Sequence, residues 1–215
     1  MHVPPSFAVA DPIGVLVDLL RTEPATLVTL GPEGLEATVV PLLLEERPGG
    51  HRALVGHVAR GNRATLDGEG REAMVLVQGP QGYVSPSWYP SKAEHAKVVP
   101  TWDYVAVQVH GRLRTIDDAA WLRSQVRRLT DRHEAGREEP WSIDDAPTSF
   151  LERMLGGIVG VEVVIERVTA KAKLSQNRSA ADVEGVIEGL RAEGPSTDRL
   201  ADAVARPPEP PEAHR

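Results

Sequence analysis

The chain has 215 residues, of which 41% are hydrophobic, and its formal net charge is −7 at pH 7. That length holds one large domain or a domain with an appendage, and the apolar content can build a sizeable core. The sequence contains no cysteine, which excludes disulfides, thiolate nucleophiles, iron–sulfur clusters and both thiolate-ligated and covalently attached haem.

Charge and hydropathy also indicate whether the protein binds nucleic acids or membranes. The acidic balance opposes non-specific attraction to phosphate backbones, so we do not expect a nucleic-acid partner. No apolar run approaches the ~20 residues of a membrane span, and the N-terminus lacks the basic, apolar pattern of a signal peptide. We therefore expect a cytoplasmic protein with no membrane segment.

The first half of the chain is predicted to be rich in strands. Asp11 and Pro12 resemble an N-cap and a first-turn proline, and helical apolar spacing continues to about residue 22. Extended segments follow over residues 25–30, 35–44, 53–59, 73–78 and 104–116, with a hairpin turn at residues 31–34. In the last segment Val105, Val107 and Val109 face one way, which predicts one buried side.

The second half alternates helices with one more strand. Helices are predicted over residues 118–135, 148–155 and 180–192, and a strand over residues 161–168. The Pro/Glu-rich end predicts a disordered tail over residues 201–215 after a single domain over residues 1–200. A strand meander with few helices predicts a mainly β fold, a closed or nearly closed barrel with peripheral helices.

The sequence lacks a dinucleotide glycine fingerprint, a P-loop, a nucleophile elbow and an HExxH zinc motif, and three clusters remain. The first is GHVARGN at residues 56–62, which puts His57 and Arg60 at the end of a strand and Asn62 at a helix start. Free backbone donors and an arginine favour an anion there, and His57 could ligate a metal through a neutral imidazole. The alternative is a structural hydrogen-bonding histidine.

The second cluster is GYVSPSWYPSKAEHAKVVPTWD at residues 82–103. Its polar groups could bind an anion and its aromatic rings could enclose a planar ring; these residues are Ser85, Ser87, Lys92, Lys97, Trp88, Tyr89, Trp102 and the adjacent Tyr104. The alternative is an ordered loop packed across a dimer interface. The third cluster, KAKLSQNRS at residues 171–179, carries Gln176 and Arg178, and its alternative is a linker capped by Ser179.

These segments resemble the PaiB-like family of FMN-binding negative transcriptional regulators. The resemblance rests on VPPSF, HVARGN, GPQGYVSPSWYPSKAEHAKVVPTWDYVAV, LTDRHEAGREEPW and KLSQNRSAADVEGVI, in that order, and extends over about residues 1–190. It implies an FMN-binding split β-barrel, usually a homodimer with two cofactor sites where the subunits meet.

Several positions depart from that family pattern. The family usually has His at Val39 and Gln108, Asn at Asp103 and Trp at Ala172, and Pro commonly stands at Arg63. Two lost imidazoles and one gained carboxylate indicate a changed cofactor site. A related branch, the piperazate synthases, looks PaiB-like but binds haem b and cyclises N-hydroxyornithine by forming a nitrogen–nitrogen bond.

The resemblance to that branch implies a haem b enzyme with His57 as the proximal iron ligand, and His95 or His110 as alternatives. The expected cofactor-binding residues are His57, Arg60, Asn62, Ser85, Trp88, Trp102, Gln176 and Arg178, with Arg60, Lys92 or Arg178 on the haem propionates. The expected catalytic residues are Lys92, His95 and Tyr89 for proton transfer and Asp103 for the substrate ammonium group.

Besides the haem enzyme, a second and a third hypothesis remain open at this point. In a flavoprotein or flavin-binding regulator, Arg60, Lys92 and Ser85 would hold the FMN phosphate, and Trp88 or Trp102 would cover the flavin ring. In the third, the protein binds no cofactor and acts through interactions with partners.

Overall fold

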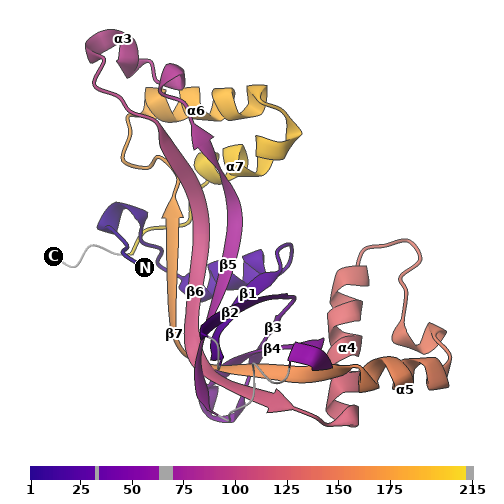
Figure 1. Ribbon diagram of the computed structural model, residues 1–215. Helices are drawn as coiled ribbons and strands as arrows, with labels where there is room; N and C mark the ends of the chain where they lie inside the picture. Colours follow the sequence, from indigo (N-terminus) through magenta and orange to yellow (C-terminus); the bar gives the residue numbers. More distant parts are fainter. Residues whose placement is uncertain (32–33, 63–69, 212–215) are drawn as a thin grey trace. The chain divides into compact units, whose positions relative to one another are not determined.

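The computed structural model describes residues 1–31, 34–62 and 70–211, and over these the chain is mainly β (Figure 1). Seven strands form one sheet in the order β2-β1-β5-β6-β7-β4-β3. Their bounds are β1 Ala25–Gly31, β2 Gly34–Val40, β3 Leu43–Glu46, β4 Arg52–Ala59, β5 Arg71–Val84, β6 Thr101–Ile116 and β7 Ile158–Lys173. The β1–β2, β1–β5, β3–β4 and β4–β7 pairs are antiparallel.

Helices flank the strands. The α-helices are α1 Pro12–Leu19, α3 Ser91–His95, α4 Ala119–Glu134, α5 Thr148–Gly156, α6 Ala180–Ala192 and α7 Pro195–Ala205. Short 3-10 turns lie at η1 Pro5–Phe7, η2 Pro48–Gly50, η3 Arg60–Asn62, η4 Pro86–Trp88 and η5 Ile143–Asp145. Among the described helices, none is long and apolar enough to cross a membrane.

The chain divides into two compact units. The first unit is Met1–Leu19, Gln78–Val107 and Thr169–Arg215, and the second unit is Leu20–Val77 and Gln108–Val168. Strands β5, β6 and β7 each contribute residues to both units, so neither unit is a continuous piece of sequence.

In the first unit, helix α6 packs against α7 and against the η4 turn. Val186 and Leu190 of α6 and Leu200 of α7 are buried. Two glycines of α6 allow the Trp88 backbone and ring to approach: a Cβ on Gly185 would lie 2.0 Å from the Trp88 carbonyl oxygen, and one on Gly189 2.2 Å from the indole ring. Any side chain at these positions would clash.

In the second unit, α4 and α5 cover part of the sheet. One apolar cluster joins α4 to strands β3 and β4 through Leu43, Ala53, Val55 and Leu129. A second cluster joins α4 to α5 and η5 through Leu122, Ile143, Leu151 and Leu155, and Trp121 packs against both clusters.

Most predicted elements are confirmed, and the mainly β fold class with them. Helix α6 has the predicted bounds, and α4 and α5 differ from theirs by about a residue. The segment 35–44 is two strands, β2 and β3, because Pro41 between them has no backbone donor for a strand ladder. The predicted 31–34 turn includes residues 32 and 33, which lie outside the described residues.

The predicted tail boundary at residue 201 is wrong. Helix α7 continues to Ala205, and Ala201 and Val204 are buried. Leu200, Ala201 and Val204 are spaced so that they form one buried face of this short helix. The proline-rich sequence that follows led to the prediction of a disordered tail from residue 201. Beyond α7 the described residues have no regular structure, although the Ala10 amide donates to the Glu209 carbonyl at 2.9 Å.

Candidate functional site

His57 lies on β4 in the second unit and is half-buried. Its Nδ1 is 2.8 Å from Oε1 of Gln125, a fully buried residue of α4. A carbonyl oxygen only accepts hydrogen bonds, so Nδ1 is the donor, and in the neutral tautomer that this bond selects Nε2 has the lone pair. An imidazole fixed in this way by a second residue is the usual arrangement of a metal-ligating histidine.

Gln125 has a second feature of interest. Its Nε2 is buried without a hydrogen-bond partner among the described residues. An unpaired buried donor costs roughly 1–3 kcal/mol of stability, which an apolar residue would avoid. Sequence reasoning missed Gln125; the available signal was an amide on the apolar stripe formed by Leu122, Val126 and Leu129 of α4.

Arg60 does not have the free guanidinium that an anion-binding role requires. It pairs with both carboxylate oxygens of Asp117 at 2.8 and 2.7 Å, and it donates to the carbonyls of Gly156 at 2.8 Å and Ile158 at 2.9 Å. These bonds tie η3 to the end of α5 and the start of β7. Arg60 thus holds these elements together, and its expected contact with a phosphate or a propionate stays a prediction that would have to replace some of these bonds. Asn62 ends η3, and Arg63 lies outside the described residues.

Asp103 is the most buried charged group of the first unit. It is 0% exposed, accepts from the Ser175 hydroxyl at 2.6 Å, and lies 3.3 Å from Nζ of Lys173. Burial raises the pKa of Asp103, and the Ser175 hydroxyl and Lys173 oppose that rise. Lys173 thus occupies the position expected for a substrate ammonium group, and the expected substrate contact of Asp103 stays a prediction that would have to displace this ion pair.

Tyr89 is also buried in the first unit, at 2% exposure. The Arg178 guanidinium lies 4.6 Å from the centre of its ring, within the range of a cation–π contact. Burial raises the pKa of Tyr89, against the effect of Arg178. Tyr89 therefore stays a phenol at neutral pH and is unsuited to the role of general base.

A cavity of about 570 Å³ in the first unit joins the second and third sequence clusters. His95 and Arg178 both line it, so the structure brings these two predicted residues together. The full lining is Pro90, Ser91, Glu94, His95, Lys97, Asn177, Arg178, Ser179, Ala181 and Asp182. The carboxylate of Asp182 holds the loop at Ser91, because it accepts from the Ser91 amide at 3.1 Å and from the Ser91 hydroxyl at 2.8 Å.

The other predicted residues of the first unit have local partners. The Ser85 hydroxyl caps η4 by accepting from the Ser87 amide, and Lys92 donates to the Ser87 hydroxyl at 3.2 Å. Gln176 bonds to its own loop, accepting from the Leu174 amide at 2.8 Å and donating to the Ala172 carbonyl at 2.6 Å. Trp102 is 51% exposed, whereas Trp88 packs on α6.

The predicted site residues thus fall into two groups. His57, Arg60 and Asn62 belong to the second unit, and the nine others belong to the first. Within the described part of the chain, no group of three or more His, Cys, Asp or Glu side chains could hold a metal ion. A metal at His57 would therefore have to bring most of its own ligands.

Comparison with known proteins defines the class first. The crystal structure of a conserved hypothetical protein, Rv2991, from Mycobacterium tuberculosis matches with a TM-score of 0.54 at 13% identity, covering 83% of this chain and 94% of that one. The flavocytochrome Anf3 from Azotobacter vinelandii matches with a TM-score of 0.52 at 17% identity, covering 77% and 69%. The fold is that of the FMN-binding split-barrel proteins.

Sequence comparison then defines the family. The family model "Putative FMN-binding domain" matches residues 1–167. The protease synthase and sporulation protein PAI 2 of Bacillus subtilis is 31% identical over 206 residues, which cover 95% of this chain and 96% of the relative. An uncharacterized protein of Emericella nidulans, AN0679, is 27% identical over 231 residues, 90% and 92% of the two chains. The chain belongs to this PaiB-like FMN-binding family, as the resemblance in the sequence implied.

Proposed function

We propose that this protein is a haem b-binding member of the PaiB-like family, with His57 as the iron ligand, and that it cyclises N-hydroxyornithine to piperazic acid. The hydrogen bond between His57 and Gln125 carries the proposal. It leaves Nε2 of a neutral imidazole as the nitrogen that can bind a metal. A porphyrin supplies four nitrogen ligands itself, which agrees with a single histidine and no larger cluster of ligands in the described residues.

FMN binding is the second candidate, and the family model favours it. The residues predicted to hold FMN fit this group less well than His57 fits iron. Arg60 is bonded to Asp117, and Ser85 and Lys92 both bond to Ser87. An FMN phosphate at these side chains would have to replace bonds that the protein already makes.

The proposed reaction forms a nitrogen–nitrogen bond between the α-amine and the hydroxylamine nitrogen, breaks the N–O bond and releases water. Haem iron, when bound, would supply Lewis-acid activation of that N–O bond. The protein must hold the flexible substrate curled, which lowers the entropic part of the barrier. It must also keep the attacking amine neutral and deliver a proton to the leaving hydroxyl.

The remaining candidates for proton transfer are Lys92 and His95. Nδ1 of His95 accepts from the Lys97 amide at 3.0 Å, so a neutral His95 carries its proton on Nε2 and can donate it. Lys92 is exposed and donates to the Ser87 hydroxyl. Lys92 and His95 stay candidates for proton transfer, and the raised pKa of Tyr89 leaves it a phenol that could donate a proton but not accept one.

Reconstitution tests the cofactor and the reaction separately. The purified protein is incubated with haemin or with FMN, freed of unbound cofactor, and measured by absorption spectroscopy. The proposal expects a Soret band after haemin, no retained flavin bands after FMN, and loss of one water from N-hydroxyornithine by mass spectrometry. Retained FMN without retained haem would favour the second candidate. Retained haem without turnover would limit the proposal to cofactor binding.

A further inference from the structure

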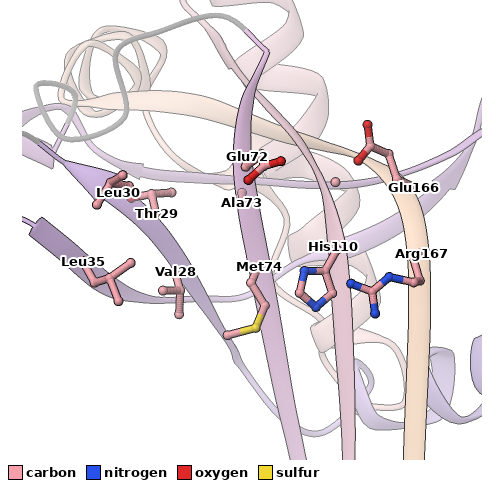
Figure 2. Close-up of a pocket in the computed structure, with 11 residues that line it drawn as sticks. Val28, Thr29, Leu30, Leu35, Glu72, Ala73, Met74, His110, Glu166 and Arg167 are labelled. Carbon is pink, nitrogen blue, oxygen red and sulfur yellow. The ribbon is translucent and has the colours of Figure 1, made fainter. Parts of the chain in front are cut away.

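A cavity of about 580 Å³ opens on one face of the sheet in the second unit (Figure 2). Strands β1, β2, β5, β6 and β7 supply its lining, which is Val28, Thr29, Leu30, Leu35, Glu72, Ala73, Met74, His110, Gly111, Glu166 and Arg167. Register places these strands' residues together, since Val28 pairs with Met74 and Leu30 with Leu35. The volume lies within the range of small-molecule sites, roughly 300–1,000 Å³.

The charged groups around this cavity differ in whether they are paired. Both acidic side chains of the lining are paired with Arg112, which lies 3.0 Å from Glu166 and 3.6 Å from Glu72. The Arg167 side chain is exposed and makes no ion pair or hydrogen bond with the described residues. Arg112 and Arg167 together balance the two glutamates, so the site is close to neutral overall, but the Arg167 guanidinium is the group whose hydrogen-bond donors are not used by an acid of the described chain.

His110 lies beside that cation. Figure 2 shows the Arg167 guanidinium extending towards the His110 imidazole from the adjacent strand. Burial lowers the pKa of His110, and the positive charge of Arg167 lowers it further. A neutral imidazole can donate one hydrogen bond next to the guanidinium without adding a second positive charge.

The opposite wall is apolar. Met74 and Val28 face the cavity, and Leu30 and Leu35 at its rim are 59% and 79% exposed. Exposed leucines that adjoin a cavity are typical of a surface that binds an apolar group. One side thus suits hydrocarbon and the other suits an anion.

We propose that this cavity binds an organic carboxylate with an apolar body, the carboxylate on Arg167 and His110 and the hydrocarbon against Met74, Val28 and Leu35. A guanidinium matches a carboxylate with two parallel hydrogen bonds. His57, the proposed iron ligand, is not among the residues that line this cavity, so the proposal is tested separately from the proposed reaction.

The test compares octanoate with octanamide, a neutral molecule of nearly the same shape, by NMR titration of the labelled full-length protein. Octanoate should shift the signals of the lining residues and bind about tenfold more tightly than octanamide, because hydrogen bonds between charged groups are stronger than those between neutral groups. Arg167→Gln should reduce octanoate binding to the octanamide level. Leu35→Asn should weaken both ligands.

Arg114→Gln is the matched control. Arg114 is an exposed arginine of β6 outside the cavity lining, and its loss should leave octanoate binding unchanged. Equal affinity for the two ligands, no shift of lining residues at millimolar octanoate, or full octanoate binding by Arg167→Gln would each overturn the proposal. A folded spectrum of each variant in the same titration separates lost binding from lost structure.

Discussion

At the scale of single residues, His57 and Gln125 connect the fold to the proposed chemistry. Gln125 is fully buried and uses only its oxygen, at 2.8 Å from His57. A buried amide with an unpaired donor contributes little to stability. Its contact with His57 Nδ1 gives the buried amide a role in orienting the imidazole.

Gln125→Leu should therefore separate stability from cofactor binding. Removing the unpaired donor should leave the free energy of unfolding of the cofactor-free protein unchanged or slightly higher. Haem retention should fall by about 10- to 100-fold, the usual effect of losing a residue that orients a metal ligand. Gln125→Glu keeps an acceptor for Nδ1 and serves as the control. Haem transfer to apomyoglobin measures retention, and unchanged transfer rates in Gln125→Leu would contradict the assigned role.

Asp103 predicts a specific dependence of stability on pH. Its pKa is raised in the folded state above the ordinary 3.8, mainly by burial, so the folded protein binds the proton more tightly than the unfolded chain does. The stabilising contribution is complete below pH 3.8 and is lost as pH rises through the folded-state pKa.

Urea unfolding of wild type and Asp103→Asn over a pH series measures this effect. The variant lacks the titrating group, so the free energy of unfolding of wild type relative to the variant should decrease as pH rises. If the relative stability of wild type instead increases with pH, the attraction of Lys173 outweighs burial and the assigned direction is wrong.

At the scale of elements, α6 can contact Trp88 closely because Gly185 and Gly189 have no side chains. Gly→Ala inside a helix normally stabilises by roughly 1 kcal/mol. At Gly189 the added Cβ would lie 2.2 Å from the indole ring, so the helix or the η4 turn must shift. Overpacking of this kind costs about 1–3 kcal/mol.

Gly189→Ala should consequently destabilise the protein. Gly156 in α5 has no atom within 4 Å of an added Cβ, so Gly156→Ala is the matched control and should be neutral or stabilising. Thermal unfolding monitored by circular dichroism measures both. Equal melting temperatures for the two variants would show that η4 does not rest on α6 as described.

The elements that sequence predicts well are those whose order is local. Asp118 and Ser179 cap α4 and α6 by accepting from the Trp121 and Asp182 amides, and both helices begin where their sequence signals place them. The full lengths of β5 and β7 were missed because long strands are held by pairing partners far along the chain.

The candidate site was predictable only in part. Residue types and spacing identified His57, but its partner Gln125 is separated by 68 residues and has no motif. Arg60 and Asp103 looked free for ligands in the sequence, because their partners Asp117 and Lys173 are distant in the chain. Which charges are already paired is decided by tertiary structure.

At the scale of the whole molecule, the aromatic, Pro-rich loop leads us to predict a homodimer. Large apolar side chains of the first unit are exposed in the single chain, including Tyr83 at 47%, Val99 at 64% and Trp102 at 51%. Such groups are common where a partner covers them. Light scattering should give about twice the 23.3 kDa chain mass. A monomer at micromolar concentration with cofactor bound would contradict this assembly.

The most direct test of the central claim is the absorption spectrum of wild type and His57→Ala, both reconstituted with haemin under the same conditions. Wild type should show a Soret band. The variant should lose it while keeping the far-ultraviolet circular dichroism of wild type, and added imidazole should restore the low-spin spectrum. A Soret band of unchanged position and intensity in His57→Ala would contradict ligation by His57.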